Sequence, residues 1–392
     1  DNGLVLINRK SPFRLFTDIS GKVGTVYCSH QFGDNLYLGT NQGLYLKIGT
    51  SNTYELIPGT SGQVWSINEI KGKLYAGHDR GIFAIEGNSA THISDGPGVW
   101  EIREFKNGLL QGHYDGISFW EEGNVENDPV YLANFDLSSR NLVVQNDSTF
   151  WVGHDHKGVF KLKINAEVNE VLDLENYSVS YDGGMGLKVF QFNGAIYYST
   201  EDEIYKYEPK TDTFSLENEL NNLIQEQRIS GISHVLPDNT WWGFGEDNLL
   251  YVTRDAFQDR LSAKSAAIPL EYRSIAKGFE NISLIGESEY LVGSNVGYTI
   301  FSTPLDLPSM EQLNINKVST AALEEEFKSH KLDLNQLELP NSVNNINFEF
   351  SIPAYSKLAK PVYSYRIKGF STGWSTWQRS SRNLIYIKLL HR

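Results

Sequence analysis

Three histidines stand at equivalent places in this sequence, each directly after a glycine: His78, His113 and His154. Histidine is the commonest metal ligand in proteins, so the pattern raises the hypothesis of a metal site. No clustered carboxylates or cysteines complete the ligand set of about four that such a site needs. Elsewhere the equivalent position is held by Thr40, Thr200, Phe244 and Ser294, which mostly suit hydrogen bonding at a turn. We therefore predict turn residues here and no bound metal.

Aspartates recur at the same turns and could suggest the paired carboxylates of a glycoside hydrolase. They are Asp79, Asp115, Asp155, Asp202 and Asp247. Catalysis needs one asymmetric pair near one bond, whereas repetition favours aspartates that cap the turns through their own side chains. No nucleophile elbow, glycine-rich phosphate loop or Cys-Cys spacing accompanies them. The sequence predicts no catalytic residue, no cofactor and a non-enzymatic function.

The turns belong to a repeat of two strands, in each of which apolar and polar residues alternate, with a glycine near the end of the first strand. The clearest copy runs from Lys73 to Ile85, and the anchor positions are Gly39, Gly77, Gly112, Gly153, Ser199, Gly243 and Gly293. Their spacing of roughly 40 residues, with short strands throughout, is typical of a β-propeller built from four-stranded blades. Seven anchors predict seven blades.

Composition and charge narrow the class of protein further. The 392 residues include 20 Phe, 21 Tyr and 8 Trp, which favours strands, and the net charge of −14 argues against direct binding to nucleic acid or to anionic lipid. Only one cysteine, Cys28, is present, which suits a reducing compartment or a periplasmic protein without disulfides. The absence of a run of about 20 apolar residues predicts no membrane insertion by this chain.

The ends of the chain suggest two domains. We predict a propeller over 1–308 and a β-sandwich over 309–392 that is incomplete at its C-terminal end. Blade seven lacks an outermost strand before Pro304, so the segment 1–17 is expected to close the ring; the alternative is that it is the tail of a preceding propeller. The fold class is therefore all-β, with a seven-bladed propeller followed by a truncated immunoglobulin-like or fibronectin-like sandwich.

Each blade also needs an innermost strand, and these strands line the central channel of a propeller. Counting twelve residues back from each anchor gives Tyr27, Trp65, Trp100, Asn141, Leu187, Gly231 and Asn281. Aromatic side chains beside hydrogen-bonding ones could bind sugar rings or amphipathic peptides; the alternative is that Trp65 and Trp100 pack between blades. The candidate ligand-binding residues are Tyr27, Gln63, Trp65, Trp100, Arg140, Asn141, Glu280 and Asn281. Arg140 could bind a carboxylate ligand, or it could pair with Asp136 or Glu280.

Near the C-terminus the run Tyr363-x-Tyr365-x-Ile367-x-Gly369-Phe370 is followed by Gly373-Trp374-Ser375-x-Trp377, with Tyr386 in a later strand. This motif resembles the triple-tyrosine domain that lies between a sensor propeller and a membrane helix in bacterial signalling proteins. Upstream, the segments 36–44, 62–66 and 278–282 are similar to the propeller of triple-tyrosine regulators that end in a LuxR-class helix-turn-helix. Hybrid two-component sensors share the blade motif.

The resemblance implies a periplasmic sensor region of an inner-membrane transcriptional regulator, which forms a homodimer in its full-length form. Its partner would be a small molecule, such as an oligosaccharide or peptide, or a protein. The alternatives are the sensor of a hybrid histidine kinase, a propeller hydrolase or lyase acting on polysaccharide through a residue such as Glu101 or Glu280, and a protein-interaction scaffold.

Overall fold

The structure is a computed structural model. It describes residues 12–49, 53–123, 128–177, 186–224, 229–245, 248–254, 260–266, 268, 273–303, 313–322, 325–330, 339, 343–352, 363–366, 373–376 and 384–388. The chain divides into two compact units, of which one spans Pro12–Leu305 and is here called the propeller unit. The described strands from Asn314 onward belong to the second unit.

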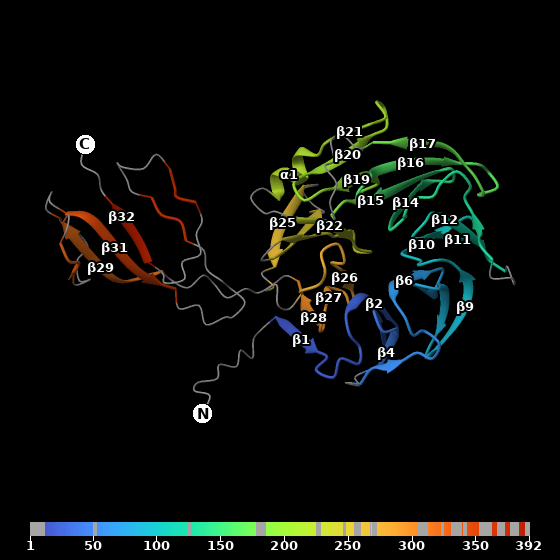
Figure 1. Cartoon of the computed structure of the whole chain (residues 1–392), viewed down its shortest axis with the longest axis horizontal. Coiled ribbons are helices and arrows are strands. Elements are labelled where there is room, and N and C mark those ends of the chain that lie inside the picture. Colours follow the sequence, from blue (N-terminus) through green and yellow to red (C-terminus); the bar gives the residue numbers. More distant parts are fainter. Residues whose placement is uncertain are drawn as a thin grey trace. The chain divides into compact units, whose positions relative to one another are not determined.

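The propeller unit consists of seven four-stranded antiparallel sheets arranged around a common axis (Figure 1). The first strand of each sheet lies nearest the axis. These strands are β2 (Val26–Phe32), β6 (Val64–Ile70), β10 (Glu101–Phe105), β14 (Asn141–Asn146), β18 (Lys188–Phe192), β22 (Ile229–Val235) and β26 (Ile282–Leu284).

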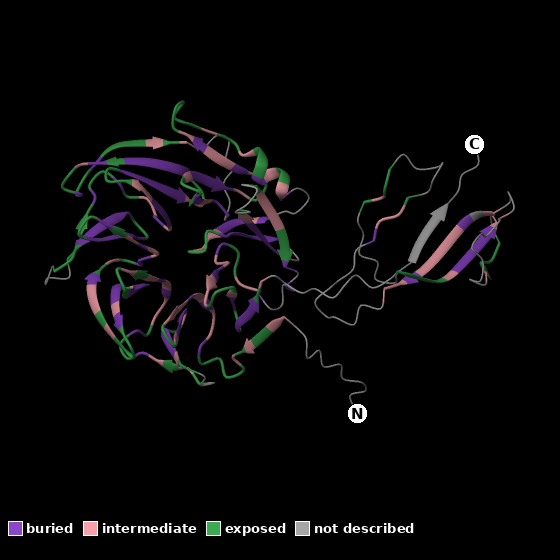
Figure 2. Cartoon of the chain, turned by 180° about the vertical axis from the view of Figure 1, so that it is seen from behind, coloured by how far each residue is buried: buried purple, intermediate pink, exposed green. Residues whose placement is uncertain are grey.

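The two middle strands of each sheet carry the repeat recognised in the sequence. The second strands are β3 (Asn35–Thr40), β7 (Lys73–His78), β11 (Gly108–Gly112), β15 (Thr149–His154), β19 (Ala195–Ser199), β23 (Trp241–Gly245) and β27 (Glu289–Ser294). The third strands are β4 (Leu44–Ile48), β8 (Gly81–Glu86), β12 (Ile117–Glu121), β16 (Gly158–Ile164), β20 (Ile204–Glu208), β24 (Leu249–Arg254) and β28 (Gly297–Ser302). Most of their residues are buried, and exposure rises toward the outermost strands (Figure 2).

The outermost strands are β5 (Glu55–Leu56), β9 (Ser89–Asp95), β13 (Val130–Tyr131), β17 (Val171–Asn176), β21 (Thr213–Leu216), β25 (Leu261–Ala266) and β1 (Phe13–Thr17). β1 pairs with β28, so a strand from the start of the chain completes the seventh sheet. Phe16 stacks on Tyr298 across this pair, with ring centroids 4.7 Å apart. The short helix α1 (Asn218–Leu223) follows β21.

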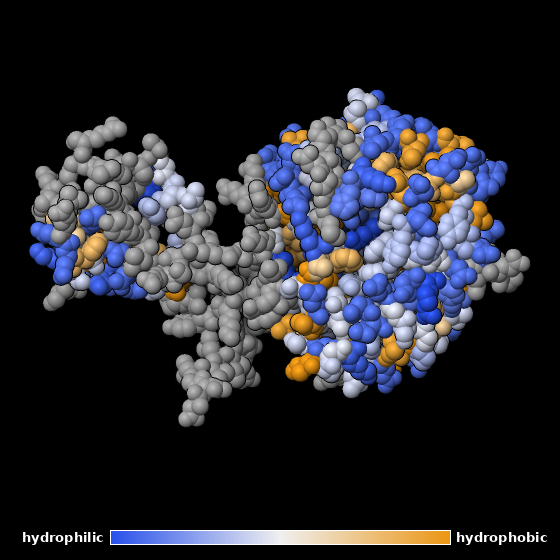
Figure 3. All heavy atoms as spheres, viewed as in Figure 1, coloured by the Kyte–Doolittle hydropathy of each residue, from blue (hydrophilic) through white to orange (hydrophobic). Residues whose placement is uncertain are grey.

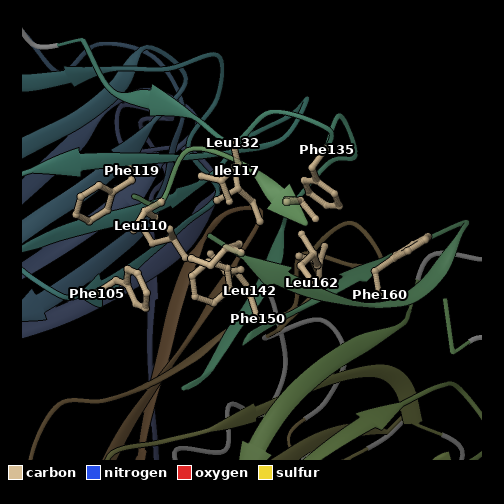
Figure 4. Packing of buried hydrophobic residues seen from close by; sticks show 14 residues of the cluster. Phe105, Leu110, Ile117, Phe119, Leu132, Phe135, Leu142, Phe150, Phe160 and Leu162 are labelled. Atoms are coloured by element: carbon tan, nitrogen blue, oxygen red, sulfur yellow. The ribbon is translucent and has the colours of Figure 1, made fainter. Parts of the chain in front are cut away.

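Hydrophobic clusters fill each space between neighbouring blades. In blade six, consecutive residues of β23 point to opposite faces: Trp241 packs against blade five and Trp242 against blade seven. This period of two lets every blade bury both faces. Figure 4 shows the cluster between blades three and four, where Phe105 and Leu110 face Leu142 and Phe150.

The anchor glycines are explained by how closely the blades approach near the axis. A Cβ on Gly112 would lie 2.1 Å from the carbonyl oxygen of Ser139, which belongs to the next blade, and a Cβ on Gly77 would lie 2.6 Å from that of Val99. Only glycine leaves room for the neighbouring backbone there. In blade five Ser199 replaces the glycine, and its hydroxyl donates a hydrogen bond to the Gly231 carbonyl at 2.6 Å.

The described strands of the second unit form one sheet in the order β30-β29-β31-β32. Their bounds are β29 (Asn314–Ala322), β30 (Lys328–His330), β31 (Val343–Ser351) and β32 (Leu384–Lys388). One sheet is compatible with half of the sandwich predicted from the sequence, and the sandwich itself remains a prediction.

Candidate functional site

The channel of the propeller contains a cavity of about 480 Å³. Residues on or just before the first strand of all seven blades line it. A cavity of this volume falls in the range of small-molecule sites, which is about 300–1,000 Å³.

An aromatic cluster forms one side of the cavity. The rings of Trp65 and Trp100 lie 4.2 Å apart between centroids, and Tyr27 lies 4.9 Å from Trp65. Phe279 contacts all three, at 5.4 Å from Tyr27, 5.8 Å from Trp65 and 6.2 Å from Trp100. Tyr114, from a turn of blade three, packs on Trp100 and accepts a hydrogen bond from the Trp65 indole at 3.1 Å. These rings come from four adjacent blades, numbers seven, one, two and three.

Local irregularities explain why Tyr27 and Trp65 face the channel. In β2 the pairing passes from Val26 to Cys28, and in β6 from Val64 to Ser66, so each aromatic residue is the extra residue of a β-bulge. A bulge bends its strand and re-aims the side chain that it carries. Trp65 and Trp100 lie outside the buried hydrophobic clusters on either side of blade two, and their rings contact each other across the boundary of blades two and three.

Arg140 joins blade four to this aromatic cluster. Its guanidinium lies 4.2 Å from the ring centre of Phe279 and 5.0 Å from that of Trp100, and it donates a hydrogen bond to the Gly278 carbonyl. Its ion-pair partner is Asp155, at 3.7 Å, instead of the Asp136 or Glu280 expected from the sequence. Burial lowers the pKa of Arg140, while the nearby Asp155 and Glu280 carboxylates oppose that shift.

The other side of the cavity is polar and comes from blades four, five and six. Lys188 and His234 line it, and the His234 ring contacts the Glu280 carbonyl at 2.9 Å. Burial lowers the pKa of His234 to about 3, and the positive charges of Lys188 and Arg140 add to that shift, so the ring is neutral. Burial also lowers the pKa of Lys188 to about 8.

Several polar atoms around the cavity make no hydrogen bond within the described part of the chain. The Ser29 hydroxyl, the Ser66 hydroxyl and the Trp100 indole nitrogen are buried without a partner. Buried polar groups are usually hydrogen-bonded, so unpaired groups around a cavity mark a place where a bound molecule could satisfy them.

Seven of the eight residues selected from the sequence line this cavity: Tyr27, Trp65, Trp100, Arg140, Asn141, Glu280 and Asn281. Gln63 is not among the lining residues; it precedes β6, and its carbonyl accepts a hydrogen bond from the Asp79 amide at 3.0 Å. Asn281 and Asn141 hold neighbouring backbones, since their amides donate to the Val26 and Leu187 carbonyls. Phe279 and Lys188 also line the cavity, although the sequence did not predict them. Lys188 directly follows Leu187, the residue that the twelve-residue count selected.

His78 and His154 act as hydrogen-bond acceptors for their turns, whereas His113 Nδ1 has no partner among the described residues and its Nε2 contacts the Ser118 hydroxyl. The amide of Arg80 donates to His78 Nδ1 and the amide of His156 to His154 Nδ1, both at 3.1 Å. Thr40 accepts the Gln42 amide in the same way, at 3.0 Å. No group of three or more His, Cys, Asp or Glu side chains in the described ranges is placed to hold a metal ion.

Asp79 and Asp155 do not cap their turns, although the sequence predicted that they would. The acceptor there is the preceding histidine, while Asp79 lies against the His78 ring and Asp155 pairs with Arg140. At the turn of Asp202 the Thr200 hydroxyl accepts the Asp202 amide. Asp247 lies outside the described residues.

In the second unit, the first tyrosine of the predicted motif is a core residue. Tyr363 is buried and packs edge-on against Phe350 with centroids 4.5 Å apart. Tyr365 exchanges hydrogen bonds with Ser375, and Trp374 is 68% exposed with Arg366 over its ring. Tyr386 lies in β32, whereas Gly369 and Trp377 lie outside the described residues.

The sequence matches no protein-family model, and no curated protein is similar to it in sequence. Among the described residues no helix is long and apolar enough to span a bilayer.

Solved structures nevertheless share the fold. The extracellular domain of the putative hybrid two-component system BT3049 from B. thetaiotaomicron superposes with a TM-score of 0.68 at 14% identity, covering 97% of this chain and 54% of that chain. That of the putative one-component system BT4673 from the same organism gives 0.53 at 15% identity, covering 96% and 55%. The WD40 propeller domain of Doa1 gives 0.50 at 14% identity, covering 74% and 97%. The chain spans about half the length of the two bacterial domains, and it has the β-propeller fold of the Doa1 domain.

Proposed function

We propose that this chain is the extracytoplasmic sensor region of a membrane-bound signalling protein and that it binds its ligand in the propeller channel. The observation that carries the proposal is the cavity of about 480 Å³, which has an aromatic side and a polar side and is lined by residues with unpaired polar groups. Aromatic rings can stack on the apolar part of a ligand, and polar groups can fix its orientation through hydrogen bonds. The fold shared with extracellular domains of putative one- and two-component systems supports the same role.

The second unit would relay the signal. The Tyr363–Trp377 motif resembles the triple-tyrosine domain. We propose that ligand binding changes the dimerisation of the full-length protein through this domain, on the periplasmic side of the inner membrane. The output that the resemblance favours is a LuxR-class helix-turn-helix, and a histidine kinase is the alternative. Sedimentation of the full-length periplasmic region with and without ligand tests the relay; a monomer under both conditions would exclude it.

The ligand site itself is tested by thermal unfolding against a panel of oligosaccharides and peptides. A ligand at about one hundred times its dissociation constant adds roughly 2.7 kcal/mol to the native state, which raises the Tm by several degrees. We expect the shift to disappear in the double variant Trp65→Ala, Trp100→Ala. Both side chains face the channel and not the cores between blades, so this variant should still fold.

The matched control is Trp374→Ala, which removes an exposed tryptophan from the second unit. It should leave the ligand-induced shift unchanged. A shift that survives in the double variant would place the ligand elsewhere and refute the channel site.

A protein-interaction platform is the second candidate function, and one observation favours it. Outer strands of adjacent blades expose large apolar side chains: Val130 and Tyr131 in β13, Leu172 and Leu174 in β17, and Leu216 in β21. Figure 3 shows hydrophobic residues at the surface over β16 and β17. If this rim is the functional surface, Leu172→Asp should impair signalling in cells while the channel double variant does not.

A further inference from the structure

Lys188 occupies a defined place in the channel. It is the first residue of β18 and pairs with Ser199, the anchor of blade five. The residues that lie opposite or beside the anchors of the seven blades are Cys28, Ser66, Glu101, Asn141, Lys188, Ser233 and Asn281. Lys188 is the one basic side chain in this set.

The other two cations that line the cavity already have ion-pair partners. Arg103 pairs with Glu101 at 3.0 Å, and Arg140 pairs with Asp155 at 3.7 Å. Glu280 accepts the Gly278 amide at 2.7 Å and lies in the field of two arginines, Arg140 and the buried Arg273. Glu104 pairs with Lys71 at 3.2 Å. The cavity is therefore lined by three acids, Glu101, Glu104 and Glu280, and by three cations, Arg103, Arg140 and Lys188, of which Arg103 and Arg140 have ion-pair partners.

The ammonium group of Lys188 makes neither a hydrogen bond nor an ion pair with any residue that the structure describes. Burial lowers its pKa to about 8; Glu101 opposes this shift, whereas Arg103 and Arg140 add to it. Lys188 is only half-buried, so its ammonium group is accessible from the cavity. An unpaired cation in a concave cavity attracts anions, because the surrounding protein concentrates its field.

Neutral hydrogen-bond donors from other blades line the same cavity and could bind further oxygen atoms of a ligand. The Ser29 and Ser66 hydroxyls and the Trp100 indole can donate hydrogen bonds, and all three are buried without a partner around this cavity. Ser29 is only 5% exposed. The aromatic cluster from blades seven, one, two and three supplies an apolar surface, while Lys188 enters from blade five.

We propose that the propeller channel selects a small ligand that carries a carboxylate, and that Lys188 is the residue that recognises this group. One unpaired ammonium matches one negative charge, and the rest of the ligand stacks on the aromatic cluster. The proposal rests on the proposed function, because it specifies the ligand class of the same channel site.

The experiment compares matched acids and amides by isothermal titration calorimetry on the purified chain. The probes are glucuronate and glucuronamide, 4-hydroxyphenylacetate and its amide, and an N-acetyl amino acid and its amide. A hydrogen bond to a charged group contributes about 1.5–3 kcal/mol, so we expect an acid to bind roughly 10- to 100-fold more tightly than its amide. The preference should weaken as the pH rises above about 8, where free Lys188 loses its charge.

Three variants identify the residue. Lys188→Met keeps the length and apolar stem of the side chain and should abolish the preference for the acid, whereas Lys188→Arg should keep it. Lys264→Met removes an exposed lysine of β25 and should change nothing. Circular dichroism of each variant confirms that it is folded.

Each other outcome overturns the inference. Equal binding of acid and amide by the unmodified chain would refute the charge selectivity while leaving the channel as a ligand site. An acid preference that persists in Lys188→Met would assign recognition to another cation. If neutral oligosaccharides or peptides give the tryptophan-dependent Tm shift but no acid binds, the carboxylate proposal alone fails. If nothing binds in either experiment, both proposals fail.

Discussion

Replacing Arg140 by alanine removes three contacts at one end of the channel at the same time. The guanidinium bonds the Gly278 carbonyl across the channel, stacks on Phe279 at 4.2 Å and pairs with Asp155 at 3.7 Å. The side chains of Arg140 and Asp155 are only 19% and 18% exposed, so water screens the pair weakly. The substitution also leaves Asp155 without its partner.

The magnitude follows from these contacts. A hydrogen bond from a charged donor contributes about 1.5–3 kcal/mol. A partly desolvated cation–π contact contributes about 0.5–2 kcal/mol. The contacts share one side chain and are not additive, so we expect Arg140→Ala to lower the free energy of unfolding by roughly 2–4 kcal/mol. For a unit of this size the Tm should fall by about 5–10 °C.

Urea unfolding followed by tryptophan fluorescence measures this loss, because Trp65 and Trp100 report on the same region. The matched control is Arg103→Ala, which also removes an ion-paired arginine of the channel; its side chain is 41% exposed, so we expect a loss of about 1 kcal/mol. A double-mutant cycle with Phe279→Leu should give a coupling energy of about 0.5–2 kcal/mol. A loss below about 0.5 kcal/mol for Arg140→Ala, or no coupling to Phe279, would show that these contacts do not stabilise the propeller.

Two further predictions concern the blades themselves. In Gly112→Ala the new Cβ would lie 2.1 Å from the Ser139 carbonyl oxygen of the next blade, so we expect the free energy of unfolding in urea to fall by about 3 kcal/mol or more. The control Gly373→Ala, whose Cβ meets nothing within 4 Å, should be nearly neutral. Equal effects of the two substitutions would refute the close-approach explanation. The Asp212 carboxylate accepts hydrogen bonds from Lys161 at 2.6 Å and from two tyrosine hydroxyls, and these bonds lower its pKa. The carboxylate therefore stabilises the folded chain above the unfolded pKa of about 3.9, and this stabilisation is lost as the pH falls below that value. Asp212→Asn should therefore reduce stability at pH 7 and flatten its decline below about pH 4, and an unchanged acid profile would contradict this assignment.

The sequence predicts the blade architecture well because one physical constraint repeats in nearly every blade. The anchor glycine must admit the backbone of the next blade, as at Gly77 and Gly112, and the alternating strands must bury both faces. These local requirements appear in the sequence at a regular spacing. The strand that completes blade seven could be inferred as well, because β28 needs a partner and Phe13–Thr17 has none nearby in the chain.

The channel was predicted only in part, because its register is not the same in each blade. Asn141 and Asn281 lie twelve residues before their anchors, but Lys188 pairs with Ser199 one position later than the count assumed. In blade six the shift between Ile229 and Ser233 has a similar effect. The partner of Arg140 could not be read from the sequence either, since Asp155 belongs to a turn that only folding brings to the channel.

These departures from the repeat are what give the channel two different sides. A strict sevenfold repeat would surround a ligand with the same group in every blade and could not fix its orientation. The bulges at Tyr27 and Trp65 turn aromatic rings toward the axis in blades one and two, whereas the regular pairing of β18 places Lys188 in blade five. Restoring the repeat therefore tests the argument: deleting Trp65 should remove the bulge, leave the ladder of β6 with β7 intact, and weaken binding of any channel ligand. If the deletion variant bound as tightly as the unmodified chain, the bulges would serve packing alone and the asymmetry of the channel would have no part in recognition.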